Sequence, residues 1–334
     1  MKLKGIITNR YLSSWPSFDL VYEWEDCISK SLSIPLIPKS GNKDRIRNLV
    51  TKYRLTKPYQ WIKKHFFSSQ NYYLYYILGV ANHSQAPLFT RKKVIPVIID
   101  FFVSQEYLPR FYENYKEYEL VLIADLDAYR FLQANHPPFR IAHFPLSLSD
   151  KYCLTPETHF EKRYPLLLAG RDNPVLNDFL SAYVAKHPDF EYVYRKYEDG
   201  RFNYYSNQTG LIGEFATREE FMNLIRASRC AFYATPGIDG DEGRTEGFSP
   251  LTPRFLEFLA AQCRVVARYV DNAEAAFYEL LSITPNIADY QQFEKILTEY
   301  LQPKTDFSDY MLYLSKHYTS ERIERLKHIV NAKA

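Results

Sequence analysis

Residues 217–236, TREEFMNLIRASRCAFYATP, and residues 252–270, TPRFLEFLAAQCRVVARYV, carry the plainest fold signal in this chain. Each segment starts with helical spacing and ends in a short run rich in β-branched and aromatic residues. Thr217 and Glu220 have the spacing of a capping box, which predicts a helix start at that point. Both segments therefore read as a helix followed by a strand. This alternation is typical of an α/β domain with a mainly parallel sheet.

The same alternation continues on both sides of these segments. Asn173 is the expected N-cap of an upstream helix, and Pro174 suits its first turn because proline lacks an N–H that the first turn would leave unpaired. Downstream, the last predicted element is one long helical region over 308–332. The other elements predicted in this half are strands over 164–171 and 190–197 and helices over 173–188, 272–281 and 289–301.

The N-terminal half predicts a second α/β domain. Its first helix is expected to have Ser17 as its N-cap, and Pro96 argues against a central position for the strand that contains it. Residues 148–163 are polar and rich in turn residues, which indicates a linker. The predicted strands of this half cover 2–9, 92–102, 119–125 and 139–147, and the predicted helices cover 17–32, 104–118 and 127–136.

Composition excludes several classes of protein. Of the 334 residues, 46% are hydrophobic and 24% are charged, which excludes disordered, collagen-like and coiled-coil proteins. The chain has no apolar run of transmembrane length, and its start, MKLKGIITNRYLSSWPS, lacks the features of a signal peptide, so a cytoplasmic protein is expected. Only 11 glycines accompany 16% aromatic residues, and neither glycine-rich nucleotide motif is present.

The four cysteines, Cys27, Cys153, Cys230 and Cys263, are widely spaced and form no C-x-x-C pair. This spacing argues against a zinc site and against a disulfide framework, and it suits a reducing compartment. Cys230 and Cys263 stand in apolar runs and are predicted to be core residues.

A basic and aromatic segment occupies residues 39–67. Between Lys39 and Lys64 it has nine Lys and Arg residues against one acid, and its end is rich in Tyr, Trp and Phe. Basic residues are attracted to anionic headgroups and Trp and Tyr favour the membrane interface, so one interpretation is a peripheral membrane contact. The other is a solvated basic helix followed by a buried strand or helix at 71–80. No further feature of the chain supports binding to nucleic acid.

The C-terminal half resembles the donor-binding half of GT-B glycosyltransferases, the retaining type that takes a sugar from a nucleotide-sugar. The likeness covers about residues 164–275 and rests on the order of the motifs LLLAGR, LIGEF, CAFYATP, EGFSPLTP, LEFLAAQC and RVVA. The resemblance implies an α/β fold with two Rossmann-like lobes that face each other across a cleft. It implies an acceptor lobe over 1–155, a nucleotide-sugar lobe over 156–306 and a C-terminal helix over 307–334 that packs on the N-terminal lobe.

The resemblance also implies roles for individual residues. Arg171 would bind the diphosphate, Glu257 would accept hydrogen bonds from the ribose, and Glu246 would contact the transferred sugar. A guanidinium meets phosphate oxygens bidentately and a helix N-terminus adds partial positive charge, so the leaving diphosphate can be stabilised without a metal. The other implied substrate-binding residues are Gly170, Gly213, Glu214, Phe215, Pro236, Gly247, Ser249, Thr252 and Arg254.

Each of these residues also has a structural alternative. Arg171 could form a surface salt bridge, Glu257 could pair with Arg254, and Glu246 could be an ordinary loop acid. The chain departs from the family in two places: ten residues rather than seven separate Glu246 from Glu257, and no Lys follows Arg171 closely. Arg254, one helical turn before Glu257, could supply the missing positive charge.

In the N-terminal lobe, Asp100 is the candidate catalytic residue. It stands near the carboxyl end of the most apolar strand, where open α/β sheets bind their ligands. An aspartate at that place is also a common helix cap. Among the histidines, His83 and His136 are alternatives, and His143 is predicted to be a satisfied core residue within a strand.

Two other kinds of protein remain open at this point. A GT-A glycosyltransferase would hold a divalent metal on Asp125 and Asp127, although these residues also fit the start of a capped helix. A two-lobe sugar-binding protein without catalysis would have a similar pattern of strands and helices. Turnover of a donor would exclude the binding protein, and loss of activity with a chelator would favour GT-A.

The resemblance implies a glycosyltransferase that uses neither a metal nor a cofactor. It would move a hexosyl or deoxyhexosyl group from a nucleotide-sugar to a hydroxyl of a glycan or lipid-linked glycan, as in the synthesis of lipopolysaccharide or capsule.

Overall fold

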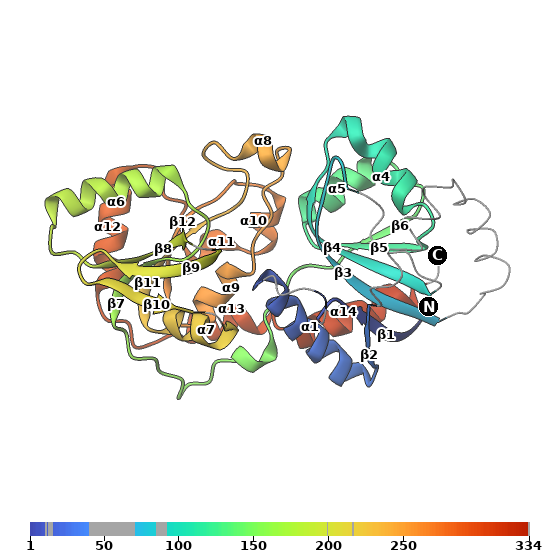
Figure 1. Cartoon of the computed structure of the whole chain (residues 1–334), viewed down its shortest axis with the longest axis horizontal. Coiled ribbons are helices and arrows are strands. Elements are labelled where there is room, and N and C mark those ends of the chain that lie inside the picture. Colours follow the sequence, from blue (N-terminus) through green and yellow to red (C-terminus); the bar gives the residue numbers. More distant parts are fainter. Residues whose placement is uncertain are drawn as a thin grey trace. The chain divides into compact units, whose positions relative to one another are not determined.

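The computed structural model describes residues 1–10, 12, 16–39, 71–84, 92–198, 200–215 and 217–332. Contacts divide the chain into two compact units. Unit 1 comprises residues 1–145 together with 319–334, and unit 2 comprises residues 146–318. Figure 1 shows the elements of both units, which are described separately below.

Unit 1 contains a parallel sheet. Within its described part, the strand order is β2-β1-β3-β4-β5-β6, and each neighbouring pair is parallel. The strands are β1 (Lys2–Thr8), β2 (Leu36–Pro38), β3 (Asn71–Ala81), β4 (Lys93–Phe102), β5 (Leu120–Ile123) and β6 (Arg140–His143). The helices are α1 (Pro16–Leu32), α4 (Leu108–Tyr115), α5 (Leu126–Ala134) and α14 (Thr319–Asn331), with a short 3₁₀ helix η1 (Gln105–Tyr107).

The sequence predicted much of unit 1, with two corrections. The helix α1 already begins at Pro16, so Ser17 lies inside it and is not its N-cap. The strand β4 pairs with β3 on one side and β5 on the other, so Pro96 does lie in an interior strand. The pairing of β4 with β5 begins at Val97, one residue after the proline, so no ladder bond to β5 requires an N–H at Pro96.

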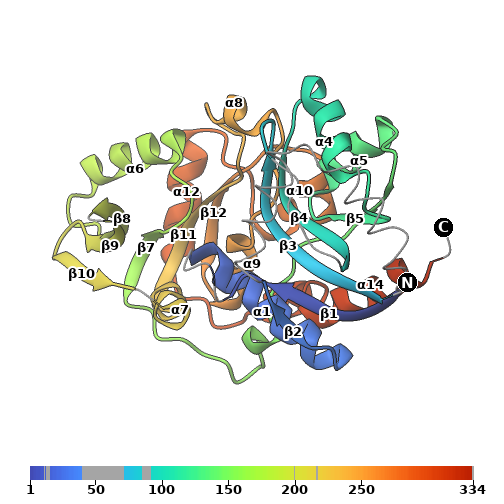
Figure 2. The ribbon, with the colours of Figure 1, turned by 45° about the vertical axis from the view of Figure 1, so that its right-hand side comes forward.

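The C-terminal helix α14 belongs to unit 1. It packs on α1 and β1, as both ribbon views show (Figure 2). The N-terminal ammonium donates to the carbonyl of Val330 at 2.7 Å, and Ile323 and Leu326 are buried. The last helical region is therefore not one helix. It divides into α13 (Ser308–Ser315), which packs in unit 2, and α14, with the break at Lys316–Tyr318.

Unit 2 contains a mixed sheet with the order β10-β9-β8-β7-β11-β12 among its described residues. The strands are β7 (Tyr164–Leu168), β8 (Tyr192–Glu198), β9 (Arg201–Ser206), β10 (Gly210–Glu214), β11 (Ser228–Ala234) and β12 (Arg264–Arg268). The helices are α6 (Pro174–Lys186), α7 (Arg218–Arg226), α8 (Glu242–Thr245), α9 (Arg254–Ala260), α10 (Ala273–Phe277), α11 (Leu280–Ile283), α12 (Tyr290–Leu301) and α13, with a 3₁₀ helix η2 (Asp150–Tyr152).

The helices of unit 2 cover both faces of this sheet because successive strand residues point to opposite sides. Leu166 and Phe232 pack with α6 and α12 on one face, whereas Leu167 and Tyr233 pack with α7, α9 and α13 on the other. Asn173 caps α6, and Thr217 and Glu220 form a complete capping box at α7, as predicted.

Residues 148–163 do not form a free linker. Leu148, Tyr152 and Leu154 are buried in the larger core cluster of unit 2, and Leu148 bridges to Tyr318. Lys162 donates to the carbonyls of Arg226, Ser228 and Ala261, which lie at the end of α7, the start of β11 and the end of α9. Hydrogen bonds from Lys162 thus fix the segment 148–163 to the ends of neighbouring helices.

The strand β9 was missed from the sequence, and it changes the direction of the sheet. It pairs antiparallel with β8 and with β10, so β10 again runs parallel to β7, β8, β11 and β12. The carboxyl end of β10 therefore lies at the same edge of the sheet as those of the parallel strands.

Candidate functional site

The candidate site of unit 2 lies where the strand order reverses. From β7 the chain passes first to β8 on one side and later to β11 on the other, and open α/β sheets bind ligands at the carboxyl ends of such neighbouring strands. Gly170 and Arg171 follow β7, and Pro236 follows β11, so these predicted residues meet at one place. A Cβ on Gly170 would lie 3.1 Å from the carbonyl oxygen of Phe232, so little more than glycine fits between the strands.

Arg171 makes an ion pair with Asp241 at 2.7 Å. Its side chain is 31% exposed, so the guanidinium remains in contact with solvent. A salt bridge of this kind was the alternative to phosphate binding that the sequence left open for Arg171. In the sequence, Arg171 comes shortly before α6, and the N–H groups at the start of a helix favour an anion.

Glu257 lies in the first turn of α9 and is almost completely buried. Its carboxylate pairs with Arg218 at 2.6 Å and with Arg254 at 2.9 Å. Burial by itself raises the pKa of Glu257, but the two guanidiniums hold it below its ordinary value. The pairing with Arg254 was the structural alternative for Glu257, and Arg218 is a second partner that the sequence did not suggest.

Aromatic side chains surround this ion pair. The guanidinium of Arg254 lies 4.1 Å from the ring centre of Phe221, a distance typical of cation–π contact. Tyr204 packs against Phe215 with ring centres 5.2 Å apart and against Phe221 at 6.2 Å. Phe215, at the end of β10, therefore reaches the surroundings of Arg254 although the two strands β9 and β8 separate β10 from β7.

Arg195, in β8, is a further cation at this edge. It donates to the carbonyl of Gly170 at 2.8 Å, and its guanidinium lies 4.6 Å from the ring centre of Phe202. It also affects the pKa values of Tyr204 and Arg254, which places it within electrostatic reach of both. Arg195 is thus a cation that contacts the backbone beside Arg171, and the suggestion that Arg254 supplies positive charge there stays a prediction.

A cavity of about 750 Å³ opens between α6 and the strands β7 and β8. Two predicted residues that follow β7, Gly170 and Arg171, line the cavity together with side chains of α6 and β8. The polar and aromatic residues that line it include Arg171, Asp172, Asn177, Ser181, Tyr192, Tyr194 and Arg195.

The remaining predicted residues of unit 2 lie on the segment before α9. The hydroxyl of Ser249 donates to Thr235 at 2.8 Å inside the core, and the N–H of Thr252 donates to Tyr233 at 3.0 Å. Glu246 is exposed and has a positive φ of 52°, and Gly247 follows it with a φ of 81°. At the other side of the sheet, Glu214 pairs with Arg201 at 3.0 Å, and Gly213 lies at an irregularity of β10. The substrate-binding roles of these residues stay predictions.

In unit 1, carboxylates gather at the ends of β4 and β5. Asp100 lies in β4 opposite Gly79 and caps no helix. Asp125 is the N-cap of α5 and accepts from the N–H of Asp127 at 2.9 Å, which is the structural alternative to a metal-binding D-x-D motif. Burial, and then the charges of Asp127 and Asp100, raise the pKa of Asp125 to about 7. Among the described residues, no group of His, Cys, Asp and Glu has the arrangement of a metal site.

His143 is a buried structural residue, as predicted. Its ring contacts the carbonyl of Ala124 at 3.1 Å through Nε2, and Arg325 lies 3.2 Å from Nδ1. Burial and the charge of Arg325 lower its pKa to about 3. Cys230 and Cys263 are likewise buried, and none of the four cysteines forms a disulfide with another described residue.

The predicted membrane contact over residues 39–67 lies outside the described residues except for Lys39. Lys39 donates to the hydroxyl of Tyr75 at 3.3 Å. The following segment, 71–80, is part of the interior strand β3. In the part of the chain that is described, no helix has the length and apolar character needed to cross a bilayer.

Sequence reasoning missed Arg195, Arg218 and Asp241. Arg195 could have been noticed as a charged residue in a tyrosine-rich strand, and Arg218 as the first residue of a capped helix. The pairing of Asp241 with Arg171 could not be predicted locally, because Arg171 is 70 residues away in the sequence.

Comparison with known proteins supports the fold. No protein-family model matches the chain, and no curated protein matches it. A putative UDP-N-acetylglucosamine 2-epimerase from Listeria monocytogenes is similar over 100% of this chain and 98% of its own, with 11% identity and a TM-score of 0.50. Sucrose-phosphate synthase from Thermosynechococcus elongatus is similar over 81% of this chain and 69% of its own, with 12% identity and a TM-score of 0.47.

A third similar structure is the pneumococcal O-GlcNAc transferase GtfA in complex with UDP and GlcNAc, with 10% identity and a TM-score of 0.45. The match covers 81% of this chain and 58% of that one, so this chain spans little more than half the length of that protein. It spans a similar share, 54%, of the chain matched in the GtfA/B complex. Together with the two α/β units, the full-length similarity to the epimerase gives this chain a fold of the GT-B type.

Proposed function

We propose that this chain is a glycosyltransferase that takes a sugar from a nucleoside diphosphate sugar. Unit 2 would hold the nucleotide-sugar, and unit 1 would hold a glycan or lipid-linked glycan whose hydroxyl accepts the sugar. The reaction would require no metal and no cofactor, and it would retain the configuration of the sugar. A hexosyl or deoxyhexosyl donor and a peripheral membrane contact through residues 39–67 belong to this proposal, as does a cytoplasmic site of action.

The observation that carries the proposal is the group of arginines at the carboxyl edge of the sheet in unit 2. Arg218 and Arg254 share the one carboxylate of Glu257, and Arg195 adds a third guanidinium near Arg254. Guanidiniums held together at a partly buried place favour an anion that accepts hydrogen bonds from them. A diphosphate supplies that anion.

The same arrangement suits the chemistry of the transfer. When the bond between the sugar and the phosphate breaks, negative charge increases on the diphosphate, and fixed guanidiniums nearby lower the barrier. Arg171, shortly before α6 in the sequence, offers a second group of donors for the same leaving group. Asp100 in unit 1 and Glu246 in unit 2 are the proposed catalytic residues, and Phe215 would contact the base.

The test is a binding and turnover experiment with the whole chain. UDP, GDP, CDP, dTDP and their sugars are titrated by calorimetry, and release of the nucleoside diphosphate is then measured with and without glycan acceptors. We expect Arg254→Gln and Glu257→Ala to weaken binding of the preferred nucleotide at least about tenfold, since each disturbs charge-assisted contacts. Arg171→Ala should abolish transfer while the fold is retained.

Arg163→Gln is the matched control. Arg163 is exposed and precedes β7, so it stands at the opposite end of the strand from Arg171. Its replacement should leave nucleotide affinity and turnover unchanged. If Arg254→Gln, Glu257→Ala and Arg171→Ala all keep the affinity and turnover of the parent chain, the proposal is wrong.

The assay also separates neighbouring activities. Conversion of UDP-N-acetylglucosamine to another sugar-nucleotide without an acceptor would indicate an epimerase. Tight binding of a nucleotide-sugar with neither hydrolysis nor transfer would indicate a binding protein.

A further inference from the structure

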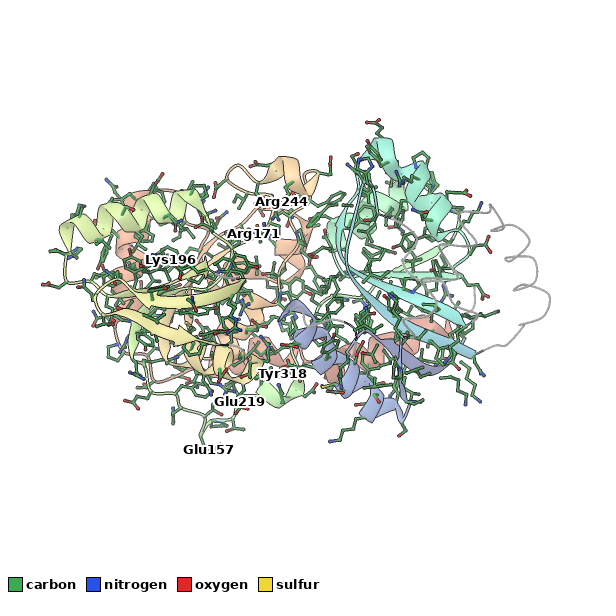
Figure 3. The ribbon with its side chains drawn as sticks, in the orientation of Figure 1. Glu157, Arg171, Lys196, Glu219, Arg244 and Tyr318 are labelled. Atoms are coloured by element: carbon green, nitrogen blue, oxygen red, sulfur yellow. The ribbon has the colours of Figure 1, made fainter. Side chains whose placement is uncertain are left out.

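The loop between β11 and α9 holds a carboxylate in a complete anion-binding arrangement. The carboxylate of Asp241 accepts from Arg171 Nη1 at 2.7 Å and from Arg244 Nε and Nη2 at 2.7 and 3.0 Å. The backbone N–H of Gly237 also donates to it, at 3.2 Å. These three donor groups, from Arg171, Arg244 and Gly237, are called the cradle below. Figure 3 labels Arg171 and Arg244, whose side chains lie close together in that view.

The donors of the cradle are those that recognise a phosphoryl group as well as a carboxylate. A guanidinium has a planar fork that fits two oxygens of either anion, and a backbone N–H completes the contact. Arg171 follows β7 and Gly237 follows β11, so the cradle stands at the point of the sheet where the strand order reverses. A ligand at that point would meet the same donors that Asp241 now occupies.

Gly237 is required for this arrangement. It has a φ of 74°, and a Cβ on it would lie 2.3 Å from the carbonyl oxygen of Phe248 and 2.5 Å from Thr245 Oγ1. Any other residue would have to shift the backbone, and the N–H that faces Asp241 would shift with it. The close approach of the loop therefore depends on glycine at this position.

A different carboxylate anchors the loop. Asp239 is paired with Arg268, at the end of β12, and accepts from the side chain of Asn173 at 2.7 Å. Those contacts hold its pKa below the usual range. Since Asp239 ties the loop to β12 and α6, Asp241 can leave the cradle without releasing the loop. The side chains of Arg171 and Asp241 are 31% and 24% exposed, so an anion from solvent can reach them.

We propose that the cradle binds a phosphoryl group of the donor and that Asp241 is an internal competitor that this group displaces. The inference rests on the proposed function and adds Arg244, the N–H of Gly237 and the exchange with Asp241 to it. Asp241 lowers the affinity for the diphosphate, because the anion must first take its place. When the diphosphate leaves, Asp241 binds the donors of the cradle again. Arg171 and Arg244 therefore have an anionic partner both with and without the ligand.

The test compares binding of inorganic pyrophosphate to three forms of the whole chain by calorimetry. Asp241→Asn keeps the size of the side chain but removes its charge, and we expect pyrophosphate to bind about tenfold more tightly, because charge-assisted hydrogen bonds are about twice as strong as neutral ones. Glu242→Gln is the matched control, since Glu242 is in the same loop but contacts the N–H of Gly240. Its affinity should stay within about twofold of the parent chain.

A third variant, Arg244→Gln, removes one donor of the cradle and should weaken pyrophosphate binding about tenfold. It keeps the inference testable if Asp241→Asn fails to fold. Equal or weaker binding of pyrophosphate to folded Asp241→Asn overturns the inference, as does unchanged binding to Arg244→Gln.

The outcome for this inference is separate from that for the proposed function. In one outcome, nucleoside diphosphates neither bind nor are released in turnover, yet Asp241→Asn binds pyrophosphate more tightly. The inference about the cradle is then supported and the proposed glycosyltransferase activity is wrong. In the other outcome, transfer occurs and depends on Arg254, but Asp241→Asn binds pyrophosphate no more tightly than the parent chain. The proposed glycosyltransferase activity is then supported and the exchange with Asp241 is wrong.

Discussion

At the scale of single residues, Asp125 is the carboxylate whose environment has the clearest consequence. Its folded-state pKa of about 7 lies well above that of an unfolded aspartate, so the folded protein binds the extra proton between about pH 4 and 7. The contribution of Asp125 to the free energy of unfolding should therefore be greatest below about pH 4. It should fall as the pH rises from about 4 to about 7.

We expect Asp125→Asn to remove that loss. Asparagine is as good an N-cap as aspartate, so α5 keeps its cap, and the buried charge near Asp127 and Asp100 is absent. At pH 8 the variant should be more stable than the parent chain, on the order of 1.4 kcal/mol for each unit of the pKa shift. Urea unfolding followed by tryptophan fluorescence between pH 4 and 8 measures this, with Glu113→Gln, an exposed acid of unit 1, as control. Parallel pH profiles for Asp125→Asn and the parent chain would contradict the prediction.

Residues whose contact partners lie three or four positions away could be predicted from the sequence. Residues whose partners are distant in the sequence could not. Asn173, Thr217 and Glu220 were predicted because a cap contacts the helix that begins beside it. Glu257 was placed correctly near the start of its helix, but its partner Arg218 comes from a different helix. The pair of Arg171 and Asp241 depends on how one long loop folds across two strands, which no local pattern records.

At the scale of elements, the errors are strands that the sequence did not indicate and the ends and partners of other segments. The strand β9 was missed because its residues, RFNYYS, are polar and aromatic without regular alternation, and it is ordered by pairing with β8. The region 308–332 has helical spacing throughout, yet it divides because α13 packs in unit 2 and α14 in unit 1. Helical periodicity reports an apolar face and not the core that the face joins.

The assignment of α14 to unit 1 can be tested with a single core residue. Leu326 is fully buried, so Leu326→Ala should cost about 2–5 kcal/mol of the free energy of unfolding of unit 1. Trp24 is buried in α1 of unit 1 and no tryptophan follows residue 61, so tryptophan fluorescence reports unfolding of unit 1. Leu312→Ala is the control, because Leu312 in α13 is 70% exposed. A loss of stability in Leu326→Ala that spares the tryptophan signal would place α14 with unit 2 instead.

At the scale of the whole molecule, each unit has its own sheet and its own core, so two unfolding transitions are expected rather than one. The ligand-binding unit can therefore be identified from the transition that a ligand shifts. A ligand that binds one folded unit raises the stability of that unit by about 2.7 kcal/mol at a hundredfold excess over its Kd. The transition of the other unit should move only if the ligand also contacts it.

We therefore expect the preferred nucleoside diphosphate to shift the transition of unit 2 and to leave the tryptophan-reported transition of unit 1 nearly unchanged. The reason is that every arginine of the candidate donor site, from Arg171 to Arg254, belongs to residues 146–318. Thermal unfolding followed in parallel by tryptophan fluorescence and by far-ultraviolet circular dichroism resolves the two transitions. Arg254→Gln should lose the shift, and Arg163→Gln should keep it. A nucleotide that stabilises only the tryptophan-reported transition would mean that unit 1 binds the donor, and it would reverse the roles proposed for the two units.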